Sequence, residues 1–333
     1  MGHDTLMMGL DAGGTSTRAV LTTAQGECIG YGVGGRGNPL SAGVDAAADG
    51  VSDAVVQALL PSGRALADVS VISAAMAGQS TVEGRGGWLL ALLMAEGFAG
   101  RLTFESDLLA TYSSGAVEPF GYAVVAGTGA SAVRVVGGEV DASADGLGWL
   151  LGDRGSGFWI GHRVARAVVR DLDHAGPATA LTRGLLDHLG IVADAGHGAG
   201  RPRALEQVVE ALYAMRPIEL AALAPLAFAA GDRVAESILR RAGEHLADSL
   251  AAVLREPGEI PHCPLVVGGS VLARDGVVRD AFMQRLGGAA TDFELRPVAD
   301  GAVGAGLLVL RAGGAHVSRG TLDRLSETLA RFR

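Results

Sequence analysis

Residues 6–18, LMMGLDAGGTSTR, constrain the fold of this chain more than any other stretch. An apolar run reaches the carboxylate of Asp11 and continues at once into two glycines and three hydroxyl residues. A buried strand that ends in such a turn is typical of a phosphate site, because glycines let the backbone approach phosphate oxygens and successive N–H groups form an anion nest. An acid at the strand end suits hydrated Mg²⁺. A simple hairpin turn with an exposed Asp11 is the alternative interpretation.

Every cationic side chain among the 333 residues is arginine or histidine, because the sequence contains no lysine. This excludes a Walker A loop, a protein-kinase active site and a Schiff-base mechanism, since each of these needs a lysine. A nucleotide would therefore have to be held by backbone N–H groups, Mg²⁺ and carboxylates.

Charge and cysteine content narrow the class of protein further. A net charge of −9 disfavours a nucleic-acid or acidic-membrane partner. Cys28 and Cys263 are the only cysteines, which disfavours a disulfide scaffold, a structural zinc site and a four-thiolate iron–sulfur cluster. No apolar run reaches the roughly 18 residues of a membrane span, and the first residues lack the pattern of a signal peptide. We therefore expect a cytoplasmic protein without a membrane partner.

The opening plan of strand, glycine turn, strand and turn occurs twice. Residues 18–23 and 28–33 predict two strands after the first turn, so an antiparallel meander begins the chain and disfavours a Rossmann unit. Residues 121–126 predict another buried strand, followed by Gly-Thr-Gly-Ala-Ser at 127–131 and a second meander. The repeat suggests two related domains that face one ligand, with the second beginning near residue 117.

The remaining pattern alternates strands with helices. Residues 34–43 read as a loop, residues 69–76 as a strand, and residues 265–267 as a strand that ends in a third turn, Gly268-Gly269-Ser270. Helices are predicted at residues 44–60, 88–94, 108–113, 158–171, 233–254, 301–310 and 321–331, and residues 177–255 read as mostly helical. Small residues at 301–310 predict close backbone approach. The fold class is therefore α/β.

Asp107 is the strongest candidate for a catalytic base. It ends a short strand at residues 102–105 and precedes a helix. The positive end of a helix keeps a carboxylate ionised, as a base for a hydroxyl proton requires. A plain N-cap role for Asp107 is the alternative.

Six motifs taken in order resemble one family. They are Asp-x-Gly-Gly-Thr-x-x-Arg at 11–18, Asn38-Pro39, Thr-Phe-Glu-Ser-Asp at 103–107, Gly-Thr-Gly at 127–129, Gly-Trp-Leu-Leu-Gly-Asp-Arg-Gly-Ser at 148–156 and Gly-Gly-Ser at 268–270. This set is similar to the N-acetylglucosamine kinases, a branch of the BadF/BadG/BcrA/BcrD-type ATPases in the superfamily of actin and the sugar kinases. The resemblance covers about residues 6–310.

The resemblance implies two actin-like, ribonuclease H-like domains with ATP and sugar in a central cleft. They would be residues 1–116 and 117–333, the second with a helical insertion and a terminal helix that packs back on the first. It also implies a homodimer and O6 phosphorylation of N-acetylglucosamine with Asp107 as base, or of glucosamine as the alternative. Asp11 would hold Mg²⁺ through water.

The implied contacts with ATP and sugar come from several turns. The phosphates would lie on Gly13, Gly14, Thr15 and Ser16, and on Gly127, Thr128 and Gly129. The adenosine would lie beside Gly268, Gly269 and Ser270. Asn38, Gly78, Asp107 and Asp153 would bind sugar hydroxyls, and Gly148 and Trp149 would border the acetamido group. A turn role for Asn38 and a packing role for Trp149 are the alternatives.

Three departures from the family pattern affect these roles. Ala130 stands where the family has a serine, so Ser131 would have to supply that hydroxyl. Arg154 replaces an acid and could pair with Asp153 or reach a phosphate. Without lysine, the adenine contact must be apolar or come from Arg274.

Two other classes of function compete with a kinase. An activator ATPase of a dehydratase needs an iron–sulfur cluster fed by two neighbouring cysteines, which Cys28 and Cys263 do not predict. A sugar-sensing repressor needs a DNA-binding segment, and none precedes residue 6. For the kinase we expect domain closure, with hinges near Gly34 and Gly115.

Overall fold

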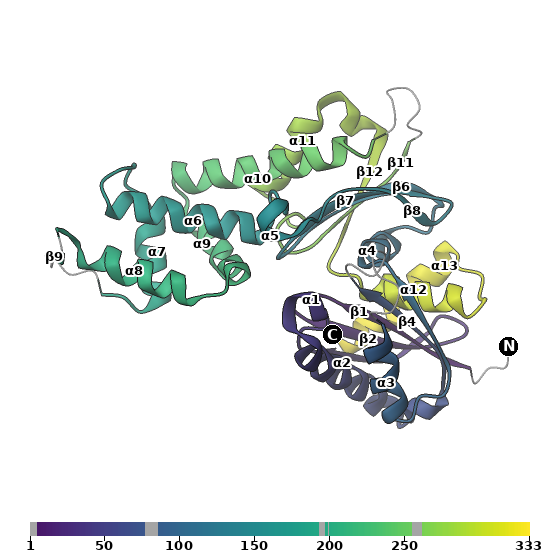
Figure 1. Cartoon of the computed structure of the whole chain (residues 1–333). Helices are drawn as coiled ribbons and strands as arrows, with labels where there is room; N and C mark the ends of the chain where they lie inside the picture. Colours follow the sequence, from purple (N-terminus) through teal and green to yellow (C-terminus); the bar gives the residue numbers. More distant parts are fainter. Residues whose placement is uncertain (1–4, 77–85, 193–196, 199, 255–261) are drawn as a thin grey trace.

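The computed structural model describes residues 5–76, 86–192, 197–198, 200–254 and 262–333. Gly78, which the resemblance assigns to the sugar site, lies outside the described residues. Two five-stranded sheets dominate the fold, and helices cover both (Figure 1).

The first sheet has the order β3-β2-β1-β4-β5. Its central strand β1 pairs antiparallel with β2 and parallel with β4, so a meander is extended by parallel strands. The predicted opening meander is therefore confirmed. The strands are β1 (Leu6–Ala12), β2 (Thr17–Thr23), β3 (Cys28–Gly34), β4 (Val69–Met76) and β5 (Arg101–Glu105).

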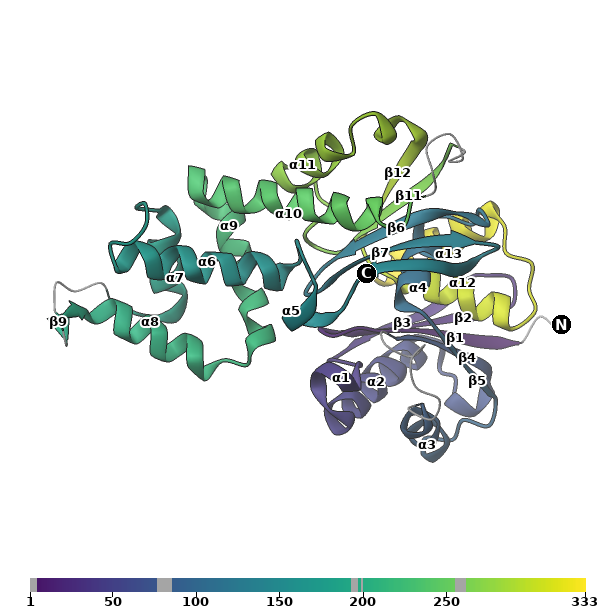
Figure 2. The ribbon, with the colours of Figure 1, turned by 45° about the horizontal axis from the view of Figure 1, so that its top comes forward.

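Both faces of the first sheet are covered, and β1 is therefore buried along its whole length. One face packs on α2 (Val44–Leu59) and α3 (Gly87–Ala95). The other packs on α12 (Ala302–Ala312) and α13 (Arg319–Leu329), which come from the far end of the sequence. Figure 2 shows these two pairs of helices, on opposite faces of the first sheet, from another side.

The second sheet repeats the first, with the order β12-β11-β6-β7-β8. Here β6 pairs antiparallel with β7 and parallel with β11. The α/β fold with two related units is thus confirmed, whereas the exact boundary near residue 117 stays a prediction. The strands are β6 (Phe120–Ala126), β7 (Ala130–Val136), β8 (Glu139–Asp145), β11 (Cys263–Gly268) and β12 (Phe293–Val298).

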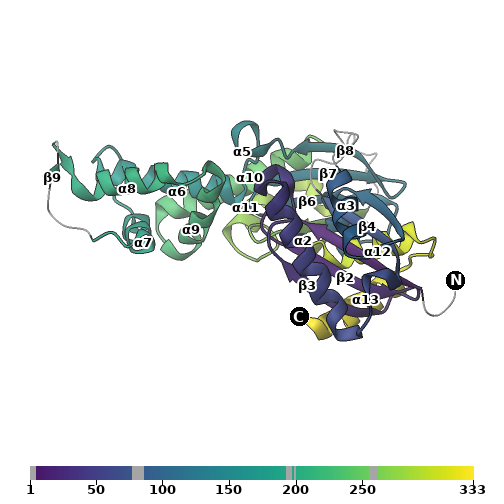
Figure 3. The same cartoon turned by 60° about the horizontal axis from the view of Figure 1, so that its bottom comes forward.

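A largely helical arm is inserted into the second half and extends away from the sheets (Figure 3). The long helix of this arm packs in the core through one apolar face, since Ile238, Leu246 and Leu250 are buried. The segment comprises α5 (Gly148–Leu151), α6 (Gly157–Leu172), α7 (Ala180–Leu189), β9 (His197–Gly198), β10 (Arg201–Pro202), α8 (Arg203–Ala214), η4 (Pro217–Leu223), α9 (Ala224–Ala230) and α10 (Arg233–Ala251). Helix α11 (Val277–Leu286) packs against α10.

Helix α4 (Asp107–Gly115) lies against α12 between the two sheets. Glycine makes this contact possible, because a Cβ on Gly304 would lie 1.7 Å from the carbonyl oxygen of Ala110. A Cβ on Gly9 of β1 would likewise lie 2.3 Å from the Ala305 carbonyl oxygen. The close approach predicted for the small-residue helix is therefore present, and it brings the first residues of α4 and α12 to the end of β1.

Short helical turns complete the described chain. One of them lies inside the predicted loop at residues 34–43, where Pro39 supplies the fixed φ that suits a first helical position. The turns are α1 (Pro39–Ala42), η1 (Leu60–Ser62), η2 (Leu66–Asp68), η5 (Gly287–Asp292) and η6 (Ala330–Phe332). None of the helices in the described ranges is both long and apolar enough to cross a bilayer.

Both predicted hinge glycines are closely packed. A Cβ on Gly34 would lie 1.9 Å from the Gly50 carbonyl oxygen, and one on Gly115 would lie 3.0 Å from Val266 Cγ2. Arg296 also donates to the Gly115 carbonyl at 3.2 Å and to Glu118 Oε1 at 2.8 Å. These contacts explain why glycine stands at both positions, and the hinge role stays a prediction.

Candidate active site

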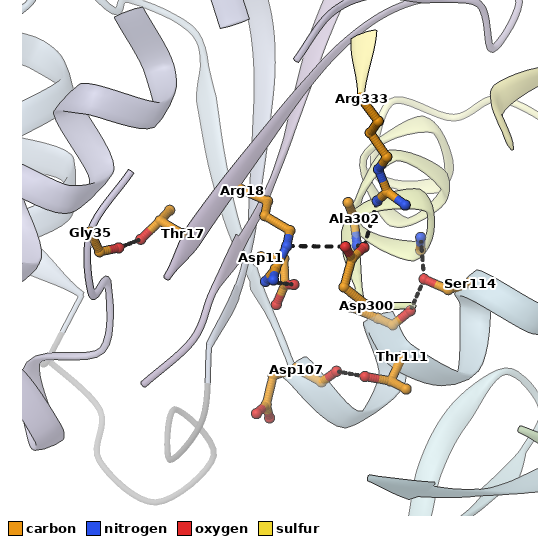
Figure 4. Close-up of polar contacts among 12 residues, drawn as sticks. Asp11, Thr17, Arg18, Gly35, Asp107, Thr111, Ser114, Asp300, Ala302 and Arg333 are labelled. Atoms are coloured by element: carbon orange, nitrogen blue, oxygen red, sulfur yellow. Dashed lines mark hydrogen bonds and ion pairs between the residues drawn. The ribbon is translucent and has the colours of Figure 1, made fainter. Parts of the chain in front are cut away.

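The first glycine turn connects β1 and β2 and is fixed by its own backbone. The Gly13 N–H donates to the Ser16 carbonyl at 3.0 Å, and the Gly37 N–H donates to the Gly13 carbonyl at 3.1 Å. Thr17 Oγ1 donates to the Gly35 carbonyl at 2.9 Å (Figure 4). Gly14 and Thr15 complete the turn, and Thr15 is exposed. A preformed turn of this kind can receive a phosphate without a large ordering cost.

Asp11 is the next-to-last residue of β1 and is buried, with an exposed fraction of 8%. The turn does join antiparallel strands, but the alternative of an exposed Asp11 is wrong. Burial raises the pKa of Asp11 to about 6, although Arg18 opposes this; the negative charges of Asp300 and Asp107 raise it further. The Gly301 N–H donates to the Asp11 carboxylate. Asp11 is therefore a buried acid close to two further carboxylates.

Asp107 is the first residue of α4 and is partly buried as a residue. The N-cap is Ser106, whose Oγ accepts the Leu108 N–H at 3.2 Å, so the expected alternative role of Asp107 as N-cap is filled by its neighbour. Burial raises the pKa of Asp107, whereas hydrogen bonds from the N–H groups of Leu108 and Asp107 itself lower it. Figure 4 shows its side chain pointing away from α12.

The second glycine turn connects β6 and β7 and abuts the first turn of α6. The Gly157 N–H donates to the Gly127 carbonyl at 2.7 Å, and the Phe158 N–H donates to the Thr128 carbonyl at 3.1 Å. A Cβ added at Gly127 would meet nothing within 4 Å, so this turn has an open side. The N-terminus of α6 adds partial positive charge beside that turn.

The third glycine turn touches both the second turn and the helix of Asp107. A Cβ on Gly269, whose φ is +85°, would lie 2.4 Å from the Ala126 carbonyl oxygen. A Cβ on Gly268 would lie 2.7 Å from Thr111 Cγ2, and Thr111 is one helical turn after Asp107. The second and third glycine turns and the predicted base are therefore brought together. Ser270 is exposed at the end of this turn.

Asp153 braces the second glycine turn from behind. Its Oδ1 accepts the Ala130 N–H at 3.1 Å, and a Cβ on Gly129 would lie 2.9 Å from the same oxygen. The Asp153 backbone has a φ of +55°, and Asp145 Oδ1 accepts its N–H at 2.5 Å. This position explains why Asp153 is buried. A contact from Asp153 to a sugar hydroxyl stays a prediction.

Two of the sequence departures receive different roles in the structure. Ser131 Oγ donates to the Ala144 carbonyl at 3.2 Å, so its hydroxyl faces β8. Arg154 Nη2 lies 2.6 Å from His245 Nδ1. The backbone N–H of Arg154 donates to Asp145 Oδ2 at 3.0 Å. Neither contact is the pairing with Asp153 that was considered for Arg154.

The other predicted sugar residues come from both halves. Asn38 is buried immediately before α1. Trp149 on α5 is 42% exposed, and its ring lies 5.9 Å from that of Phe158. Gly148 has a φ of +80° and no heavy atom within 4 Å of an added Cβ. Trp149 is therefore accessible, while its contact with a sugar stays a prediction.

The sequence reasoning missed a charge network around Asp11. Arg18 Nε lies 3.1 Å from Asp300 Oδ2, and its Nη1 lies 3.4 Å from Asp11 Oδ2. Arg333 Nη2 lies 2.7 Å from Asp300 Oδ1. Arg18 belonged to the first motif but had no role assigned to it, and Asp300 lies two residues after the end of β12 (Phe293–Val298). That position at a strand end was the available signal.

These residues have the chemistry that Mg²⁺–ATP requires. Asp11 and Asp107 carry carboxylate oxygens of the kind that Mg²⁺ binds directly or through water. The glycine turns offer backbone N–H groups and an open side at Gly127 where a phosphate can approach.

Comparison with known proteins agrees with this arrangement. Residues 8–309 match the BadF/BadG/BcrA/BcrD ATPase family, and the chain belongs to that family. It is similar to the N-acetyl-D-glucosamine kinase of Dictyostelium discoideum, with 26% identity over 92% of this chain and 98% of that protein.

Two further proteins are similar. The glucosamine kinase GspK of Vibrio cholerae is 29% identical over 54% of this chain and 60% of its own length. A crystal structure from Chromobacterium violaceum, described as a candidate N-acetylglucosamine kinase, superposes with a TM-score of 0.71 at 25% identity and covers 92% of this chain and 100% of that one.

Proposed function

We propose that this protein is an ATP-dependent kinase that phosphorylates O6 of N-acetyl-D-glucosamine, with Asp107 as general base. The observation that supports this most is the convergence of three glycine turns and Asp107. Gly268 packs against Thr111 one turn after Asp107, Gly269 packs against the second turn, and Asp107 affects the pKa of Asp11 beside the first. The names of the similar proteins support an amino sugar as acceptor.

In the proposed reaction the turns at residues 13–16 and 127–129 hold the phosphates of ATP, and the turn at 268–270 lies by the adenosine. Asp11 would hold Mg²⁺ through water, and the ion would supply neutralising charge for the phosphates. Asp107 accepts the proton of the sugar O6 hydroxyl. The oxygen attacks the γ-phosphorus, the bond from that phosphorus to the bridging oxygen breaks, and ADP leaves with the electron pair.

The sugar is proposed to lie between the two halves. Asn38, Gly78, Asp107 and Asp153 would bind its hydroxyls, and Gly148 with Trp149 would border the acetamido group. Closure of the halves on the sugar would keep water from the γ-phosphate. A homodimer in the cytoplasm completes the proposal, and light scattering after gel filtration tests the dimer.

The buried cysteines disfavour the activator-ATPase alternative. Cys28 begins β3 of the first sheet and Cys263 begins β11 of the second. Burial raises the pKa of both thiols to about 11, so neither resembles a thiolate ready to bind iron.

A coupled assay of ADP release tests the proposed function. The acceptors are N-acetylglucosamine, glucosamine, glucose and buffer alone, and phosphorus-coupled NMR of the product locates the new ester. We expect the highest kcat/KM with N-acetylglucosamine and a phosphate on O6. Preference for glucosamine would select the alternative substrate, and ADP release independent of any sugar would reject the kinase.

A further inference from the structure

We infer that Asp300 is a positioning residue that holds Arg18 away from full pairing with Asp11 and so keeps Asp11 available to a divalent cation. This inference rests on the proposed function, in which Asp11 faces Mg²⁺–ATP. It assigns a role to a residue outside the six motifs.

The first observation is that the Arg18 guanidinium lies at unequal distances from two carboxylates. Arg18 lies between two carboxylates, with Nε 3.1 Å from Asp300 Oδ2 and Nη1 3.4 Å from Asp11 Oδ2 (Figure 4). Charge-assisted N–H···O bonds are typically about 2.7–2.9 Å long. Arg18 is thus closer to Asp300, and its contact with Asp11 is long.

The second observation is that Asp300 is itself fixed from two further sides. Its Oδ1 accepts the Ala302 N–H at 3.0 Å, at the start of α12, and lies 2.7 Å from Arg333 Nη2. The Arg333 guanidinium in turn lies 5.4 Å from the centre of the Tyr31 ring. The Asp300 side chain is only 15% exposed, so it has little freedom to follow Arg18.

The physical argument is that Arg18 and a divalent cation compete for the carboxylate of Asp11. A guanidinium pairs most strongly with a carboxylate through two parallel hydrogen bonds, and a divalent cation needs the same oxygens. Without the negative charge of Asp300, Arg18 has a single remaining acidic partner in this network, Asp11. Arg18 would then shift toward Asp11, and a cation would have to displace it.

The simplest competing explanation is that Asp300 attracts the cation by its own charge. The two explanations differ in what happens when Arg18 is also removed. If Asp300 acts through Arg18, then Arg18→Gln should abolish the effect of Asp300→Asn. If Asp300 acts directly, the effect of Asp300→Asn should persist in the double variant.

The test is Mn²⁺ binding by electron paramagnetic resonance, with a non-hydrolysable ATP analogue present. The proteins are wild type, Asp300→Asn, Arg18→Gln, the double variant, and Asp323→Asn as a control. Asp323 pairs with Arg319 on α13, so the control removes the same charge from an exposed pair outside the site. Asp300→Ser, whose hydroxyl can still accept the Ala302 N–H, replaces Asp300→Asn if the latter melts early.

We expect Asp300→Asn to weaken Mn²⁺ binding about tenfold and the double variant to bind within about threefold of Arg18→Gln. The Mg²⁺ concentration for half-maximal activity should rise in Asp300→Asn while kcat at saturating Mg²⁺ stays near wild type. Unchanged Mn²⁺ binding in Asp300→Asn, or a double variant much weaker than Arg18→Gln, overturns the inference. A wild-type protein that binds no Mn²⁺–nucleotide overturns the proposed function as well.

Discussion

The two halves of the molecule share one strand topology, but they differ in the residues at the end of the strand that precedes each glycine turn. In the first half, the next-to-last residue of β1 is the buried Asp11, whose carboxylate belongs to a network of charged side chains. In the second half, β6 ends in Ala126, whose carbonyl accepts the Val271 N–H at 3.0 Å. The first half therefore has a charged side chain beside its glycine turn, whereas the second half has hydrogen-bonded backbone there.

The position of the nearest acid in each half sharpens this difference. Asp11 comes from the strand itself. A Cβ added at Gly301 would lie 3.0 Å from Asp11 Cγ, so the two residues are in close contact. Asp153 comes from a loop and accepts the Ala130 N–H within the second turn. The Asp11 carboxylate thus lies in the network with Arg18 and Asp300, and the Asp153 carboxylate holds the second turn. A duplicated supersecondary unit can be specialised by changing the residue at a strand end.

Removing charge from the first half should have the largest effect on activity. Asp107→Asn is expected to lower kcat by about 10²–10⁴, since a positioned base typically contributes that much. Sugar binding by calorimetry and the melting temperature should stay near wild type, with Asp323→Asn as the control. Turnover within about tenfold of wild type would remove Asp107 as the base.

Altering backbone in the second half should separate stability from binding. Gly269→Ala is expected to cost about 1–3 kcal/mol in urea unfolding, because its φ is positive and its Cβ would meet the Ala126 carbonyl. Gly127→Ala is the matched variant, since its Cβ meets nothing within 4 Å. It should unfold like wild type and yet bind ATP more weakly. Equal loss of stability in both variants would contradict the conclusion that an added Cβ is crowded at Gly269 and unhindered at Gly127.

The smallest expected effect concerns the segment that connects the halves. Arg296 holds the pKa of Glu118 at about 2, below its usual 4.5, chiefly through side-chain hydrogen bonds. A lowered pKa adds stability that is present above pH 4.5 and is lost as the pH falls toward 2. Wild type should therefore exceed Glu118→Gln in melting temperature at pH 6, and the gap should narrow between pH 4.5 and 2. The Glu118 side chain is 38% exposed, so solvent screening keeps the difference small.

Local patterns predicted much of this molecule. Apolar runs that end in glycine turns identified both meanders, because strand and turn preferences act between neighbouring residues. The same reasoning identified Asp107 at a strand end. It could not assign the N-cap to Ser106, because both neighbours are good N-cap residues.

The unpredicted features depend on contacts between residues far apart in the sequence. Arg18 pairs with Asp300 only because α12 returns to the first sheet, and no local pattern specifies that return. The brace formed by Asp153 requires a positive φ at a non-glycine residue, which is uncommon and seldom predictable. The close packing of Gly34 and Gly115 was not predicted for the same reason, because it depends on partners elsewhere in the sequence. Conformational freedom and tight packing both favour glycine.

The origin of α12 and α13 has a consequence for how the chain matures on the ribosome. Met7 and Val20 of the first sheet are covered by Leu307, Leu310 and Leu325, which are made long after them. One side of the earliest strands must therefore stay exposed to chaperones or to other nascent chains during most of synthesis. Pulse proteolysis of ribosome-stalled chains should show those strands becoming protected only after α13 has emerged.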